Sequence, residues 1–143
     1  MGHYEWLRFK AMAGSGHTKP GIAGFEALAA EAMQSIPEEL RARVENVVVR
    51  VEEFPDQETQ HEMELDSPND LLGLYRGVSL DLKSVADVTA EVDMIFLYRN
   101  PILEYRAETG EDLFHLVRHV LIHEIGHHFG FSDDDMERIE EET

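Results

Sequence analysis

Cysteine is absent from the 143 residues of this chain. Its absence excludes disulfide bonds, cysteine nucleophiles and zinc sites built on thiolates. Any metal site in the chain must therefore use histidine, aspartate and glutamate side chains, all of which are present.

Basic residues are scarce, since 12 lysines and arginines face 30 aspartates and glutamates, and the formal net charge is −18. Such a surface repels phosphate groups, so we expect neither a nucleic acid nor an anionic membrane as a partner. Solubility alone also accounts for the charge. The chain has no apolar run long enough to span a bilayer, and its first residues lack the apolar stretch of a secretory signal. A cytoplasmic location is the default expectation.

The length suits a single domain with one core, and a hydrophobic fraction of 43% is ordinary for a globular protein. The first twenty residues differ from the rest, because they combine Arg8, Lys10 and Lys19 with a single acid and end in a stretch containing Gly, Ser and Pro. We expect residues 1–20 to be a flexible leader and residues 21–143 to form the domain.

Hydrophobic periodicity and turn residues predict the elements of this domain. They are a helix over residues 22–35, a short helix from Pro37 to about Val44, a strand at 46–54, an acidic loop with at most a short turn of helix at 55–69, strands at 71–76 and 94–99 around a segment without a clear pattern, a helical piece from Pro101, a main helix over about 110–129 and an exposed acidic helix at 133–142. The sum is an α+β fold, a small domain with a three- or four-stranded sheet packed on helices.

The main helix near the C-terminus has recognisable ends and one apolar face. Thr109, followed three residues later by Asp112, resembles a capping box, and Gly130 is placed to end the helix in a left-handed turn. At about 100° per residue, Glu124 falls inside the apolar face. Burying a polar group costs free energy unless it has partners, and a metal ion with its water would supply them.

This helix carries the pattern H-E-x-x-H, with His123 and His127 around Glu124. The two histidines are one turn apart on the flank of the apolar face, so both imidazoles can reach one ion. Glu124 projects between them and is placed to take a proton from a metal-bound water. After Gly130 the chain reverses, and Asp133 is positioned to supply a third ligand.

The third ligand is the less specific part of this prediction. Asp133 opens an acidic run, so Asp134, Asp135 or Glu137 is an alternative ligand, and Asp133 could instead cap the last helix. Oxygen-ligand chemistry and the spacing favour Asp133. Ligation by two histidines and an aspartate suits zinc, although it is compatible with other first-row divalent ions.

The stretch HEIGHHFGFSDDD resembles the zincin metallopeptidases with the extended motif H-E-x-x-H-x-x-G-x-x-D. More closely, residues from about 25 to 140 resemble the small bacterial zincin-like metallopeptidase family, whose members have segments similar to LLGLYRG, IFLYRNP and the Arg-His pair before the motif. The resemblance implies a zinc-dependent hydrolase that cleaves a peptide or protein substrate. It also implies His123, His127 and Asp133 as ligands of one zinc ion and Glu124 as the general base. Larger metzincins differ, because they usually have histidine at the third ligand position and a methionine turn well downstream.

Other polar residues near the motif carry weaker expectations. His115 and His119 continue the four-residue spacing but drift by about 40° per step, so we expect them to face solvent or to hydrogen-bond a ligand. His128 falls on the apolar face and is expected to be a hydrogen-bonded core residue. The candidate oxyanion donors are Tyr98, Tyr105, Arg118 and His128. In related zincins an extended substrate pairs with an edge strand above the metal, and residues 94–99 are the candidate for that strand.

Two other functions remain open. Bacterial ribosomal-RNA maturation proteins have a similar H-x-x-x-H-x-x-G-x-x-H skeleton, but the glutamate after the first histidine and the negative charge argue against a metal-dependent ribonuclease. A metal-carrying or protein-interaction domain that does no catalysis is the other alternative.

Overall fold

The computed structural model describes residues 19–82 and 88–142. Most of the predicted leader, residues 1–20, therefore lies outside the described residues. Pro20, at its end, contacts the domain, because the Arg99 guanidinium donates a hydrogen bond of 2.6 Å to its carbonyl oxygen. No helix among the described residues is long and apolar enough to cross a membrane.

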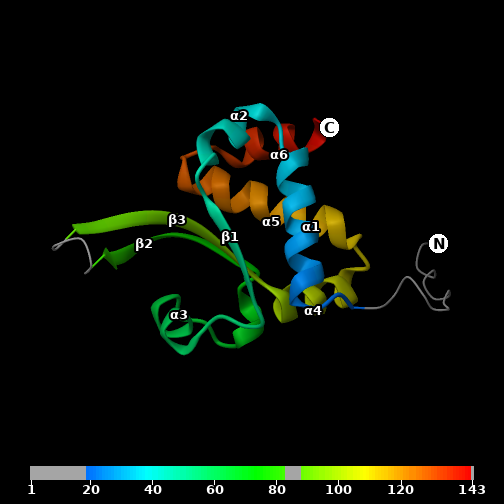
Figure 1. The fold of residues 1–143 in the computed structure, drawn as a ribbon. Coiled ribbons are helices and arrows are strands. Elements are labelled where there is room, and N and C mark those ends of the chain that lie inside the picture. Colours follow the sequence, from blue (N-terminus) through cyan, green and yellow to red (C-terminus); the bar gives the residue numbers. More distant parts are fainter. Residues whose placement is uncertain (1–18, 83–87, 143) are drawn as a thin grey trace.

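Three strands form the sheet of the described chain, with β3 (Val88–Tyr98) between β1 (Val48–Glu52) and β2 (Gly73–Leu82). β1 runs parallel to β3, and β2 runs antiparallel to it. The predicted strands are confirmed, but β2 and β3 extend well beyond their predicted ends into a long hairpin. Figure 1 shows this hairpin extending past β1, away from the helices. The antiparallel pairing of residues 73–82 with residues 88–97 joins the two strands by backbone hydrogen bonds even where the side-chain pattern is weak.

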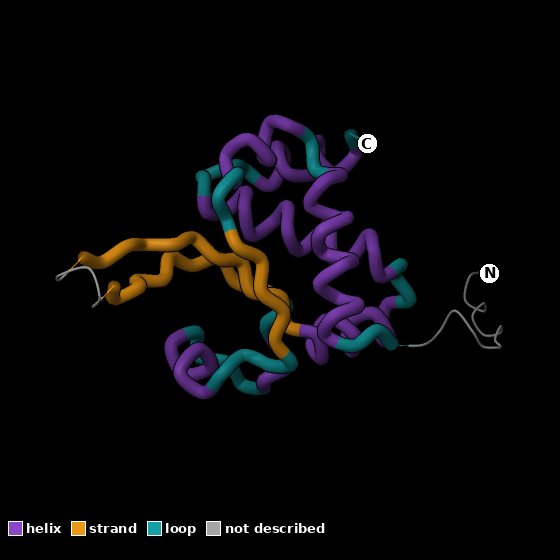
Figure 2. Tube along the Cα trace, viewed as in Figure 1, coloured by secondary structure: helices purple, strands orange, loops and turns teal. Residues whose placement is uncertain are grey.

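Helices α1 (Ile22–Ser35) and α5 (Leu113–His128) lie on one side of the sheet, as Figure 2 shows. The core fills the space between them and the sheet, and Ile95 and Leu97 of β3 point into it. Their neighbours Met94 and Phe96 point to the opposite face, where they line a hollow of about 570 Å³. The expected α+β fold, a small zincin-like domain with helices on a three-stranded sheet, is thus confirmed.

The shorter helices also follow the sequence closely. Pro37 precedes α2 (Glu38–Arg41) and the 3-10 turn η2 (Ala42–Val44), and α4 (Arg99–Thr109) begins two residues before Pro101. The segment predicted as acidic loop contains α3 (Gln57–Glu62) and the turn η3 (Pro68–Asp70). Asp56 starts α3 by accepting a hydrogen bond of 2.7 Å from the Thr59 amide, which also lowers the pKa of the Asp56 carboxyl.

The ends of α5 differ in part from prediction. Asp112, not Thr109, caps the helix, because its carboxylate accepts a hydrogen bond from the His115 amide at 3.1 Å. The Thr109 hydroxyl instead donates to the Tyr105 carbonyl, and Gly110 ends α4 with a φ of 76°. The glycine that separates the two helices therefore moves the start of α5 to Leu113. At the other end, Gly130 adopts a φ of 79°, as predicted for a left-handed turn.

After this turn, α6 (Asp133–Glu141) packs back along α5. The two helices are in close contact at Gly126, where an added Cβ would lie 2.7 Å from Met136 Cγ and clash with the Met136 sulfur. Met136 is fully buried, so its side chain has little room to move. The missing side chain at Gly126 therefore sets the distance between the two helices.

We expect Gly126→Ala to lower the free energy of unfolding by roughly 1–3 kcal/mol, because the added methyl group overpacks the contact with Met136. Alanine's higher helix propensity offsets at most about 1 kcal/mol of this loss. Urea unfolding followed by circular dichroism measures the effect. Gly21→Ala is the matched control, since nothing lies within 4 Å of a Cβ at Gly21. An equal loss in both variants would contradict the packing argument.

Candidate metal centre

Three histidines of α5 share one flank of the helix. His123 is the most enclosed, with 28% of its side chain exposed, whereas His119 is 45% and His127 is 58% exposed. The His123 ring lies between the other two, with centroids 4.0 Å from that of His119 and 5.8 Å from that of His127. His123 is therefore the residue that a metal site on this flank is built around.

Glu124 projects from α5 toward the sheet, as its helical phase predicted. Its Oε1 accepts a hydrogen bond of 3.2 Å from the backbone amide of Tyr75 in β2. Burial raises the pKa of the Glu124 carboxyl, while the Tyr75 amide and the nearby His127 lower it to a smaller extent. The carboxylate is thus held in a fixed place and made more basic than an exposed glutamate.

Tyr75 forms the wall beside this carboxylate, a role that sequence reasoning missed. Its ring stacks on His128 with centroids 3.9 Å apart and an interplanar angle of 17°. Its hydroxyl donates a hydrogen bond of 2.9 Å to Asp93 Oδ2. Burial is the main cause, and the Asp93 carboxylate the second, that raises the pKa of Tyr75 to about 12. The tyrosine side chain therefore stays neutral and orders the residues around Glu124.

Asp133 is the first residue of α6 and lies next to the motif. Its Oδ1 is 3.8 Å from His127 Nε2, and its side chain is 89% exposed. It does not cap the helix, because Ser132 does so by accepting a hydrogen bond from the Asp135 amide. Asp135 in turn accepts from the Ser132 amide, and Asp133 is the carboxylate at the start of α6 that lies against His127.

Glu140, on the last turn of α6, is a second residue that the sequence analysis missed. Its Oε2 lies 2.7 Å from His119 Nδ1, and its Oε1 lies 3.1 Å from His123 Nε2. The only sequence signal for it is its spacing, because seven residues separate Asp133 from Glu140 and place both on one face of α6.

The residues considered as oxyanion donors lie in different surroundings. Arg118 is buried and donates to main-chain carbonyls of Glu140 and Glu142, so it holds the fold together. Tyr98 is a core residue, and Tyr105 is exposed on α4. His128, expected in the core, is instead exposed, and its ring stacks on that of Tyr75.

The candidate edge strand was also wrong. Residues 94–98 belong to β3, the central strand, whose two sides are paired with β1 and β2. The edge strand beside Glu124 is β2, as the Tyr75 hydrogen bond shows. Sequence reasoning could not order the strands, because β3 pairs with β1 although β2 lies between them in the sequence.

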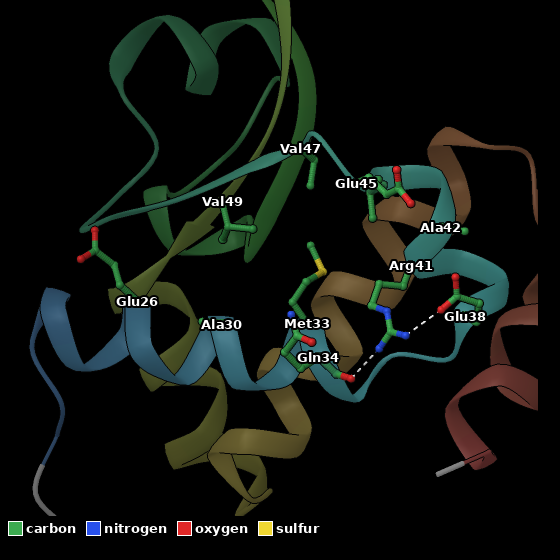
Figure 3. Close-up of a pocket in the computed structure, with 11 residues that line it drawn as sticks. Glu26, Ala30, Met33, Gln34, Glu38, Arg41, Ala42, Glu45, Val47 and Val49 are labelled. Carbon is green, nitrogen blue, oxygen red and sulfur yellow. Dashed lines mark hydrogen bonds and ion pairs between the residues drawn. The ribbon is translucent and has the colours of Figure 1, made fainter.

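A hollow of about 560 Å³ opens far from the motif, between α1, α2 and β1 (Figure 3). Its apolar part comes from Ala30, Met33 and three valines, Val44, Val47 and Val49. The cation in it, Arg41, is paired with Glu38 and with the Gln34 carbonyl oxygen. No cluster of catalytic or metal-ligating groups lines this hollow among the described residues.

Comparison with known families agrees with this geometry. The model of the zincin-like metallopeptidase family matches residues 44–143. The chain belongs to this family. A search of curated proteins finds no match to the chain. Membership implies a metal ion, typically zinc, and the matched region contains β1, β2, β3 and all of α5 and α6.

The residues of the motif fit such an ion. Two ligands that bind one zinc at 2.0–2.2 Å with tetrahedral geometry are about 3.4 Å apart, so the 3.8 Å between His127 and Asp133 needs only a small adjustment. His123, now turned to Glu140, has to rotate toward His127 to join them. The three side chains that the structure brings within 4.8 Å of one another are instead His119, His123 and Glu140.

Metal content tests the centre directly. The purified protein is expected to carry about one zinc per chain, measured by mass spectrometry, and His123→Ala is expected to lose it, because His123 takes part in every arrangement described above. His61→Ala, which changes an exposed histidine of α3, should keep the metal. Absence of metal from the wild-type protein, even after zinc is added, would contradict the assignment.

Proposed function

We propose that the protein is a zinc-dependent metallopeptidase in which His123, His127 and Asp133 hold the ion and Glu124 is the general base. The observation that carries the proposal is the placement of Glu124, a largely buried carboxylate fixed by the Tyr75 amide and adjacent to two histidines one turn apart. The groups that stabilise its charge are the Tyr75 backbone amide and, to a smaller extent, His127.

The chemistry follows from these positions. A zinc ion held by the three ligands would lower the pKa of a water molecule and polarise the carbonyl of the scissile bond. Glu124 accepts the proton of the attacking water and passes it to the leaving amine. Its raised pKa suits this double role, since the same group has to bind the proton and then release it. The Tyr75 amide keeps the carboxylate oriented during both transfers.

The substrate is proposed to be an extended peptide that pairs with the open edge of β2. Because the Tyr75 amide points to α5 and away from β3, the backbone groups of residues 73 and 77, two positions away on either side, point to the same edge. That edge runs directly past Glu124. A peptide lying along it places its backbone carbonyls beside the base, as recognition by strand addition requires.

A second candidate function is metal binding without catalysis. It is favoured by one observation, namely that the ligand atoms nearest to one another belong to His119, His123 and Glu140 and not to the full motif set. A ribonuclease is not favoured, because a chain with a net charge of −18 repels a polyanionic substrate. The Glu124 variant below separates the first two functions.

Glu124→Gln is expected to lower kcat for peptide hydrolysis by about 10²–10⁴-fold or more while the zinc content stays unchanged, because it removes the base and no ligand. Turnover of a peptide library and metal analysis of the same samples are the measurements. Glu108→Gln, an exposed change on α4, is the matched control. Undiminished turnover in Glu124→Gln would rule out the mechanism, and no turnover by the fully loaded wild-type protein would favour metal binding without catalysis.

The same variant makes a thermal prediction for the metal-free protein. The folded-state pKa of Glu124 is raised, so its contribution to stability is present below the unfolded pKa and is lost as pH rises through the folded pKa. At pH 7 the neutral glutamine therefore removes a buried charge and keeps the acceptor for the Tyr75 amide. We expect the Tm of metal-free Glu124→Gln to equal or exceed that of the wild type at pH 7, measured by circular dichroism. A clear fall in Tm would show that the carboxylate stabilises the fold.

A further inference from the structure

Three side chains converge where α5 faces the end of α6. They are His123, the first histidine of the H-E-x-x-H motif, His119 one turn before it, and Glu140 of α6. The two oxygens of Glu140 lie 2.7 Å from His119 Nδ1 and 3.1 Å from His123 Nε2. One nitrogen of each histidine and one oxygen of the glutamate all lie within 4.8 Å of one another. Two imidazoles and a carboxylate are a ligand set that binds zinc and other first-row divalent ions.

We propose that His119, His123 and Glu140 form a second transition-metal site, which shares His123 with the motif site and holds an ion in an alternative, non-catalytic position. The proposal concerns metal binding alone and stands whether or not the protein hydrolyses peptides.

The antiparallel packing of α6 on α5 accounts for two sites side by side. α5 offers histidines at 119, 123 and 127, so each neighbouring pair is one turn apart. α6 offers Asp133 beside His127 and Glu140 beside the other pair. The two carboxylates are seven residues apart, or about 10 Å along the helix, so one ion cannot bind both. Each carboxylate therefore completes a different pair of histidines.

Glu140 is held in place before any ion binds. The buried guanidinium of Arg118, the residue before His119, donates to the Glu140 and Glu142 carbonyl oxygens at 3.1 Å each and to Ser35 Oγ at 2.9 Å. The last turn of α6 is thereby fixed to α5 and α1. Preorganised ligands lose less conformational entropy on binding, which favours this set.

A hollow of about 220 Å³ opens beside two of the three ligands, His119 and Glu140. Glu111, Phe114, His115 and Arg118 line it together with His119 and Glu140. It gives an ion access from solvent and leaves room for a water molecule as the fourth ligand that a three-residue zinc site usually has. The carboxylate of Glu111 at its rim adds attraction for a cation.

Sharing of His123 makes the two positions mutually exclusive. His123 Nε2 lies against Glu140 in this structure and would have to leave it to join His127. An ion at the proposed site also lies away from the base, because His119 and Glu124 differ by about 140° around the helix axis. The proportion of chains with the ion beside Glu124 then depends on the difference in affinity between the two positions.

Zinc titration of the metal-free full chain by calorimetry tests the proposal. His127→Ala removes a motif ligand only, and it is expected to bind one zinc with a Kd within about tenfold of the wild-type value, through the other set. The double variant His127→Ala/Glu140→Gln lacks a ligand of each set and is expected to bind at least about a hundredfold more weakly. His115→Ala, which lines the hollow without belonging to the set, should bind as the wild type does.

The opposite pattern would overturn the proposal. If His127→Ala binds as weakly as the double variant, and Glu140→Gln alone binds as the wild type, then Glu140 only hydrogen-bonds the histidines. Circular dichroism of each variant establishes that it is folded, and His127 is exposed enough for its replacement to be tolerated. Peptide turnover by Glu124→Gln is independent of these titrations, so failure here leaves the proposed hydrolase standing.

Discussion

The close contact between α5 and α6 at Gly126 is the constraint on which the rest of the site depends. A side chain at this position would push against Met136, which α6 inserts into the core together with Ile139. Because the contact is this close, carboxylates on α6 come within reach of histidines on α5. Asp133 and Glu140 owe their places to it, since both lie on the face of α6 that turns toward α5. The glycine in the middle of H-E-x-x-H is therefore as important for the geometry as the residues that bear the chemistry.

A second close approach fixes the other half of the site. Gly73 opens β2 against Val120 of α5, where an added Cβ would lie 2.7 Å from Val120 Cγ1. Two residues later the Tyr75 amide reaches Glu124. The histidine flank of α5 thus faces α6, while Glu124 faces the sheet edge. The 3.6-residue period of the helix therefore places the candidate ligands and the candidate base on different sides of it.

Local sequence predicted those parts of the fold and site that depend on local physics. The span of α1, the left-handed turn at Gly130 and the inward phase of Glu124 follow from periodicity and glycine conformation, and all three are confirmed. The parts that failed depend on long-range packing. Nothing near Glu140 in sequence indicates that it meets His119, and nothing near residues 94–99 indicates that they form a central strand. His128 was misplaced because a helical wheel gives the phase of a residue and not what packs against it, here the ring of Tyr75. Gly110 shifted the cap of α5 because a glycine at that position ends the preceding helix.

The Arg118 hydrogen bonds join Ser35 to a residue 83 positions later, and the Arg138–Glu39 pair spans 99 positions. The parallel pairing of β1 with β3 adds further contacts between distant residues. A topology of this kind closes large loops before it gains stabilising contacts, and such domains fold more slowly than helical bundles of the same size. The motif helix has 16 residues, a length at which an isolated helix is only marginally stable in water. The meeting of the α5 histidines with the α6 carboxylates is therefore a property of the closed chain and not of the segment that carries the motif.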